Sequence, residues 1–533
     1  MTSAPTTPEA PPEPAVGPEA EASAAPPLAG IVRRGMGFFA ALNVISKFAA
    51  FGSNIILAWI LAPHDFGIYG TAIAVAAVVA IFRDGGVREL LVQRRAAQYD
   101  DLVGPIFWYG LTISGLAGLV LAAAAPWLAD LYEMPGLVWP LVVIAISLPL
   151  GVPGSVLRSK LRIDLRFGTL GNITLISNVL RYSSTIVFAL LGAGALSFVL
   201  PLILMALYEW VACAIVTKEN PLRHVLGFAR WGEIFHQTKW LIVGAFAFMM
   251  VEQGDYLVAG IFVSEATMGF YFFAAQLLFQ TSYAMLSYTA QLVLFPSLVK
   301  IVGEPQRKLQ ASLRFLNSLM LVAAPMSIGL AVIAHPLFDV LLQPKWKASV
   351  LALQVLAALY PLRCTIGLTT SILWAKGRFK RNAAYMLFEG AVLLTTTAIT
   401  ARYWGTPVAI AAGVGVSLSC TRLIVCVLTF RVLGGRALDV LGGCLFAWAL
   451  ALGAAAVTLW VDARFTESLP AIARLLANGT LFSIVYALLA RLIMPAQIFE
   501  ALVMAPARLQ PLIVRLLGLS SRHPPPESGA PPM

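Results

Sequence analysis

Long apolar runs separated by short polar or charged segments extend along most of the sequence. Each run is about as long as the 20 residues that a helix needs to cross a bilayer, whereas strands of an outer-membrane barrel alternate over about ten positions. The pattern therefore predicts an all-α polytopic membrane protein with about 14 transmembrane helices. We place the predicted spans at residues 38–62, 67–83, 105–129, 138–157, 169–192, 196–217, 240–263, 269–298, 313–338, 348–374, 383–401, 406–430, 440–461 and 469–493.

The composition agrees with this interpretation. Hydrophobic residues make up 59% of the 533 residues and charged residues only 12%, whereas soluble domains carry about 25% charged residues. All five cysteines lie inside apolar runs, so we interpret them as small buried hydrophobes rather than disulfide partners or metal ligands. The five histidines lack metal-ligand spacing, and we expect neither a metal nor a cofactor.

The net charge of +11 follows the predicted topology. If the N-terminus is cytoplasmic, most basic residues fall in cytoplasmic segments, which is the positive-inside pattern. The charge therefore indicates topology and contact with anionic lipid head groups, not a nucleic-acid partner. The outer loops hold only Lys345, Lys347, Arg402, Arg464 and Arg474.

A short repeat suggests two related halves. The segment LAPHDFGIY at residues 61–69 resembles VSEATMGFY at residues 263–271, 202 positions later, and Gly52 and Gly254 share that offset. We therefore expect two pseudo-symmetric six-helix lobes followed by two C-terminal helices, a plan common among membrane transporters. The expected divisions are a disordered cytoplasmic tail at 1–30, an N-lobe at 31–217, a linker at 218–239, a C-lobe at 240–430, helices 13 and 14 at 431–493, and a cytoplasmic tail at 494–533.

The sequence offers little for covalent chemistry. It contains no G-x-x-x-x-G-K-[ST] phosphate loop, no G-x-S-x-G elbow and no H-E-x-x-H motif. The outer loops are too short for the catalytic domain of a membrane polymerase or glycosyltransferase. We therefore expect no catalytic residues and do not expect an enzyme.

Ionisable residues at membrane depth are candidate functional residues, because burying them in lipid is costly. Helix 1 carries Asn43 and Lys47, and helix 5 carries a polar stripe that includes Asn178 and Arg181. With Arg363 in helix 10, these residues are our predicted substrate-binding set, since cations lining a cavity suit an anionic group such as a pyrophosphate.

Acidic residues at membrane depth leave two interpretations open. Glu252 and Asp255 lie one turn apart in helix 7 and are candidates for proton or sodium coupling, although simple ion pairing would also explain them. Glu209, Glu389 and Arg422 lie nearer the cytoplasmic side. For these three, pairing that holds helices together is an equally good interpretation.

Two segments carry a resemblance to a known family. Residues 61–70 (LAPHDFGIYG) and 82–95 (FRDGGVRELLVQRR) resemble the signature of bacterial polysaccharide-export flippases. These flippases belong to the multidrug/oligosaccharidyl-lipid/polysaccharide exporter superfamily. Residues 334–347 (AHPLFDVLLQPKWK) and 374–379 (WAKGRF) look like its second-lobe segment and the following turn. The resemblance covers residues 30–430, and helices 13 and 14 carry no matching motif.

The resemblance implies a V-shaped transporter in the bacterial cytoplasmic membrane. Its substrate would be a polyprenyl-pyrophosphate-linked oligosaccharide moved by alternating access for capsule, exopolysaccharide or O-antigen assembly, alongside polymerase and export machinery. Alternatives are a multidrug antiporter, a membrane-embedded polymerase and a lipid-II-type flippase. In the turn at residues 61–69 we expect Gly67 to permit a tight turn and Asp65 to cap helix 2.

Overall fold

The computed structural model describes residues 46, 49–84, 99–164, 166–223, 231–283, 286–287, 294–295, 297–301, 304–466 and 468–494. The predicted tail at 1–30 and all but Met494 of the predicted tail at 494–533, together with Asn43 and Lys47, lie outside these residues. Twelve helices in the described part are long and apolar enough to cross a membrane, and a shorter apolar helix covers Ala49–Ile60. The chain is an all-α multi-pass membrane protein, as the sequence predicts.

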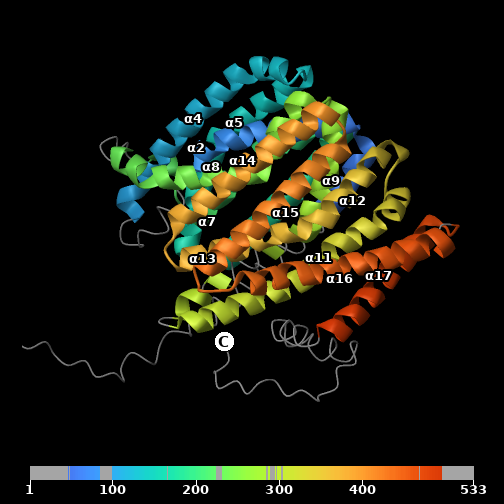
Figure 1. Ribbon diagram of the computed structural model, residues 1–533. Helices are drawn as coiled ribbons and strands as arrows, with labels where there is room; N and C mark the ends of the chain where they lie inside the picture. The colour runs from blue at the N-terminus through green and yellow to red at the C-terminus, as the bar shows by residue number, and fades with distance from the viewer. Residues whose placement is uncertain are drawn as a thin grey trace, which may run out of the picture.

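The first group of helices forms the N-lobe (Figure 1). In this lobe α5 packs against α4 and α7, and α7 packs against α6. Its helices after Ala49–Ile60 are α2 (Pro63–Asp84), α4 (Tyr99–Leu131), α5 (Val138–Ile163), α6 (Phe167–Leu190) and α7 (Leu196–Thr217), with 3-10 turns at η2 (Pro135–Leu137) and η3 (Pro221–Arg223).

The second group forms the C-lobe, in which α14 packs against α8 and α15, and α12 packs against α15. Its first helix begins inside the predicted linker at 218–239. The elements are α8 (Trp231–Phe262), α9 (Glu265–Leu278), the π-helical turn η5 (Phe279–Tyr283), α11 (Pro305–Leu341), η6 (Pro344–Trp346), α12 (Lys347–Leu359), the 3-10 segment η7 (Tyr360–Thr365), α13 (Ile366–Ala375), α14 (Phe379–Trp404) and α15 (Pro407–Arg431).

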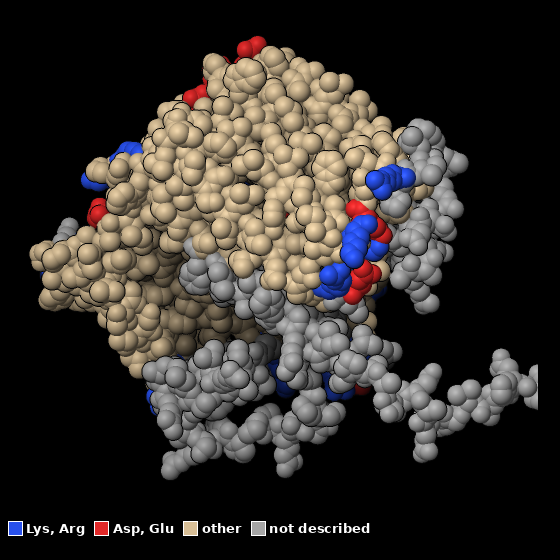
Figure 2. Space-filling view, turned by 180° about the vertical axis from the view of Figure 1, so that it is seen from behind, with Lys and Arg blue, Asp and Glu red and all other residues tan. Residues whose placement is uncertain are grey.

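Two further helices, α16 (Ala437–Val461) and α17 (Ala471–Ile493), are joined by the π-helical turn η8 (Asp462–Thr466) and pack against α11 at one flank (Figure 1). Their outer surfaces are apolar: Leu488 and Leu492 are exposed. Figure 2 shows a face almost free of charged residues, which gather near its edges. An apolar surface of this extent fits a bilayer rather than water.

The predicted tenth helix is not continuous. The span expected at 348–374 divides into α12, η7 and α13. Pro361 lies in the 3-10 segment, where its missing N–H and ring prevent a regular α-helical hydrogen bond. Broken helices at membrane depth are tolerated where protein or a water-filled cavity surrounds them, and η7 is buried.

The two ends of the bundle differ in charge. One end of the bundle carries many basic residues, and we call it the basic end. The basic residues at or beside its helix ends are Arg162, Arg166, Arg378, Arg381 and Arg436. The other end, where α2 and α9 begin, we call the closed end. The lobes are joined there.

The repeated segments meet at the closed end. The main packing of the N-lobe on the C-lobe is that of α2 on α9 and α8. A Cβ atom on Gly67 would overlap the backbone carbonyl oxygen of Glu265, and one on Gly269 would overlap that of Pro63. Because each contact maps onto the other under the 202-residue offset, the two halves contact each other reciprocally.

This contact corrects the interpretation of Gly67. The residue lies inside α2, which begins at Pro63, so it does not form a tight turn. Glycine is required there because the two backbones approach too closely for a side chain. Asp65 likewise lies inside the first turn of α2 and is not its N-cap residue. Its carboxylate accepts a hydrogen bond from the backbone N–H of Ala62, just before the helix, at 2.9 Å.

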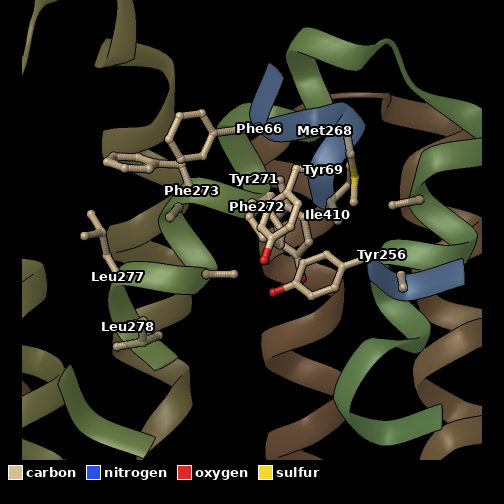
Figure 3. Packing of buried hydrophobic residues seen from close by; sticks show 14 of the residues in the cluster. Phe66, Tyr69, Tyr256, Met268, Tyr271, Phe272, Phe273, Leu277, Leu278 and Ile410 are labelled. Atoms are coloured by element: carbon tan, nitrogen blue, oxygen red, sulfur yellow. The ribbon is translucent and has the colours of Figure 1, made fainter. Parts of the chain in front are cut away.

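An aromatic cluster surrounds the glycine contact (Figure 3). The Phe66 ring lies 5.0 Å from those of Phe198 and Trp346 and 5.5 Å from that of Phe273. These edge-to-face arrangements are favourable beyond simple burial. They join α2 to elements of both lobes.

Polar links reinforce the closed end. The Trp346 indole N–H donates to the Ala58 carbonyl at 2.8 Å, and the Lys345 ammonium donates to that of Leu61 at 2.7 Å. The Tyr132 hydroxyl donates to the Leu257 carbonyl at 3.0 Å. Burial raises the pKa of Tyr132 to about 12, so the hydroxyl remains protonated and able to donate.

We expect Gly67→Ala to destabilise the protein, because its methyl group would collide with backbone that cannot rotate away. Overpacking of this kind costs about 1–3 kcal/mol, and thermal unfolding in detergent would show a lowered Tm. The matched control is Gly52→Ala, where an added Cβ meets nothing within 4 Å. A Gly67→Ala protein as stable as Gly52→Ala would contradict the close contact.

Candidate functional site

A large hollow lies between the lobes and extends to the basic end. Its volume is about 1390 Å³. Residues of α2 form one wall, and residues of α8, η5, α13 and α14 form the others. Its lining is largely apolar, including Ala77, Ala80, Val243, Phe248, Phe279 and Ile366, with polar positions at Gln253, Ser287, Thr370 and Asn382.

The turn between α13 and α14 forms the basic rim of this hollow, which we define as Arg378, Lys380 and Arg381. All three side chains are exposed. Gly377 has a φ of +68°, a left-handed conformation that favours glycine and reverses the chain between the helices. The sequence therefore places three cations within four residues at the hollow's mouth.

A buried ion pair lies deeper in the hollow. Glu252, which lines it, accepts a hydrogen bond from the Tyr283 hydroxyl at 2.7 Å, and its other oxygen lies 3.3 Å from Arg363 Nη2. The Arg363 guanidinium also lies 5.1 Å from the ring centroids of Tyr283 and Tyr360. The broken helix at η7 thus supplies a cation that neutralises Glu252.

Among the described residues, Asp255 differs from Glu252 in forming no salt bridge, although the charge of Arg363 acts on it. One carboxylate oxygen accepts a hydrogen bond from the Tyr271 hydroxyl at 2.5 Å. The other, Oδ1, is buried and has no hydrogen-bond partner among the described residues. A buried carboxylate with one neutral donor is costly when charged, so this position favours a bound proton or cation.

Two further ion pairs confirm the interpretation that Glu209 and Glu389 hold helices together. Arg422 and Glu389 form a salt bridge between α15 and α14, with both side chains almost fully buried. Arg158 Nη1 lies 2.7 Å from Glu209 Oε2, joining α5 to α7. In this conformation Glu209, Glu389 and Arg422 therefore form ion pairs that join neighbouring helices.

A smaller hollow of about 420 Å³ lies in the N-lobe. It shares Ala77 and Ala80 of α2 with the larger hollow. Its polar lining consists of Arg158, Arg162, Glu209 and the serines Ser147, Ser155 and Ser159. Both hollows thus flank the same stretch of α2.

The predicted substrate-binding residues divide between two places. The structure brings Arg363 together with Glu252 and Asp255 in the C-lobe. In the N-lobe the Asn178 side chain donates to the Ser46 hydroxyl at 3.1 Å, so the α6 stripe faces the first helix. Arg181 is half-buried there, and its side chain has no ion-pair partner in the described part of the chain. Neither Asn178 nor Arg181 lines the two hollows.

In the sequence, the basic rim carries no signal beyond that of membrane topology. Cations in loops usually only set the orientation of a protein in the membrane. Nothing in the local sequence therefore distinguished this turn from the other basic turns. The position of Gly377 between two apolar spans predicted a turn, but only the packing of α13 and α14 around the hollow brings that turn to its mouth.

The sequence is similar to that of proteins of polysaccharide biosynthesis. Residues 56–351 match the model of a family described as "Polysaccharide biosynthesis protein". The chain belongs to this family. It is 26% identical over 308 residues to the succinoglycan biosynthesis transport protein ExoT of Rhizobium meliloti and 24% identical over 315 residues to the teichuronic acid biosynthesis protein TuaB of Bacillus subtilis. The alignments span 57% and 59% of this chain but only 62% and 64% of the relatives' lengths.

The fold of this family member also resembles a solved structure. The lipid II flippase MurJ in an inward closed conformation matches with a TM-score of 0.67 at 12% identity, covering 85% of this chain and 98% of MurJ. At this identity the likeness shows a shared fold alone.

We expect Glu389→Gln to destabilise the protein strongly, because it leaves the Arg422 charge buried without a counter-charge. Removing one partner of such a pair costs about 3–5 kcal/mol, whereas replacing both with apolar residues is often neutral. Thermal unfolding should therefore show a much lower Tm for Glu389→Gln than for Glu389→Leu/Arg422→Met. Equal losses in both variants would mean that packing, not charge, explains the effect.

Proposed function

We propose that the protein is a flippase that moves polyprenyl-pyrophosphate-linked oligosaccharides across the bacterial cytoplasmic membrane for exopolysaccharide, capsule or O-antigen assembly. The observation that carries the proposal is the 1390 Å³ hollow between the lobes. It reaches the basic end, while the glycine contact closes the other end. Family membership and relatives named for succinoglycan transport and teichuronic acid biosynthesis support this substrate class.

The charge distribution supports an orientation. Loops rich in Lys and Arg remain in the cytoplasm, so the basic end would face the cytoplasm, as would both termini. The hollow is then accessible from the side where lipid-linked sugars are assembled. Outward release would require the closed end to separate, which is the alternating-access cycle.

In this mechanism the protein makes and breaks no covalent bond. The polar head group passes through the protein while the lipid tail stays in the bilayer. The head group therefore does not enter the lipid interior, and the tail does not enter water. Membrane lipids would contact the apolar outer face, and a polymerase or export machinery would receive the substrate.

A multidrug antiporter is a weaker alternative for this cavity. The acid that lines the larger hollow, Glu252, is already paired with Arg363. The remaining charged lining residues in the described part are cations, which would repel cationic drugs.

The proposal predicts the phenotype of a deletion. Removing the gene should abolish surface polysaccharide while the lipid-linked oligosaccharide accumulates in the inner leaflet, and the wild-type gene should restore both. Glycan analysis with leaflet-specific labelling would measure this. Normal polysaccharide together with new sensitivity to cationic drugs would instead support the antiporter.

We further propose that Lys47 and Arg181 bind the anionic head group, with Asn43 and Asn178 as polar neighbours in the N-lobe and Arg363 contributing from the C-lobe. The support is their depth in apolar spans and the contact between α6 and the first helix.

Lys47→Ala and Arg181→Ala should each abolish polymer export without reducing the amount of protein in the membrane. The matched control is Arg431→Ala, which removes a charge that lines neither hollow. Normal export in both variants would refute this assignment.

Coupling to an ion gradient is proposed for Asp255, with Glu252 beside it. Asp255→Asn should remove the response of substrate flipping to a proton or sodium gradient in proteoliposomes, because the amide cannot take up either ion as the carboxylate does. Tyr271→Phe is the control, since it removes the hydrogen bond but keeps the carboxylate. An Asp255→Asn protein that still responds to the wild-type gradient would exclude this role.

A further inference from the structure

The charges that line the larger hollow are unevenly placed. Arg363 neutralises the charge of Glu252. The other charged residues of the described lining are those of the basic rim, Arg378, Lys380 and Arg381, so the lining has a net positive charge. The side chains of Arg378 and Arg381 have no hydrogen-bond or ion-pair partner in the described residues. Surface arginines that line an apolar cavity in this way are available to an anionic ligand.

We infer that this basic rim is the docking site for the phosphate groups of a lipid, which it holds while the attached head group enters the hollow. The inference rests on the proposed function and deepens it by assigning the contact with the lipid phosphates to the turn between α13 and α14.

The position of the rim matches the depth of a lipid phosphate. The turn at 376–378 joins the ends of two candidate membrane spans, the broken segment Pro344–Ala375 and the helix Phe379–Trp404. We therefore place it at the level where lipid phosphates reside. Trp374 and Phe379 flank the rim, are exposed, and have ring centroids 6.2 Å apart. Aromatic residues at this depth are typical of the membrane interface.

The charge of the rim matches a diphosphate better than a zwitterionic lipid. Arginine binds phosphate oxygens through paired N–H groups, and the rim supplies two arginines, Arg378 and Arg381. The N-terminus of α14, where the N-cap residue Arg378 makes no side-chain cap hydrogen bond, adds the positive end of the helix dipole. The apolar walls behind the rim would repel a fully hydrated inorganic ion, so an anionic amphiphile fits best.

The test measures binding by the full-length protein in nanodiscs of uncharged phosphatidylcholine. The probes are undecaprenyl diphosphate, undecaprenol as an uncharged lipid, and inorganic pyrophosphate as a free anion. The double variant Arg378→Gln/Arg381→Gln is compared with Arg431→Gln/Arg436→Gln. This control removes two exposed cations from another turn of the basic end, away from both hollows.

We expect the rim variant to bind undecaprenyl diphosphate at least about tenfold more weakly than the wild type, since each lost charge-assisted hydrogen bond is worth that much. The control should change affinity by less than about twofold, because exposed charges away from the ligand are screened. Binding of undecaprenol should be the same in all proteins.

Three results would overturn the inference: wild-type affinity in the rim variant, equal losses in both double variants, or no diphosphate-lipid binding by the wild type. Pyrophosphate binding as tight as that of the lipid would make a free anion the ligand and overturn the lipid assignment. A flipping assay separates the two proposals. If the wild type binds undecaprenyl diphosphate through the rim but does not flip it, the flippase proposal fails while the docking site stands.

Discussion

The reciprocal backbone contact between α2 and α9 is the constraint on which the arrangement of the lobes depends. Gly67 and Gly269 each face a carbonyl oxygen of the opposite helix so closely that neither position can carry a side chain. A helix crossing at glycine gains dispersion contact along the backbone, which matters in a bilayer because lipid removes the hydrophobic drive for helix association. The repeated sequence thus builds a two-fold contact within one chain.

Closure at that end determines where the molecule can be hollow. The aromatic cluster around Phe66 and the hydrogen bonds from Lys345 and Trp346 hold the lobes together near the start of α2. Toward the basic end no such glycine crossing brings α2 against the C-lobe in the described residues, and the two hollows lie on either side of it there. Because the bundle is closed at one end, the larger hollow opens only toward the basic end in this conformation of the described residues.

The buried charges of the C-lobe have separate roles. Arg422 with Glu389 is almost fully buried and joins α14 to α15. Glu252 with Arg363 lies at the cavity wall, where the broken helix brings an arginine to an acid. Asp255 is the exception because its only described side-chain donor is the neutral Tyr271 hydroxyl. In each of the two ion pairs the partners neutralise each other's charges, whereas the missing partner of Asp255 Oδ1 among the described residues is what the proposed ion coupling would require.

The all-α membrane fold, the approximate number of spans and the two related halves could be predicted from the sequence alone. Span length and charge placement are local properties that the bilayer constrains directly. The packed helices were needed to show that Gly67 serves a helix crossing rather than a turn, that Glu389 pairs with Arg422, and that the turn at 376–378 lines a cavity. These depend on contacts between residues far apart in the chain, whose geometry is set by helix packing and leaves no periodic signal in the sequence.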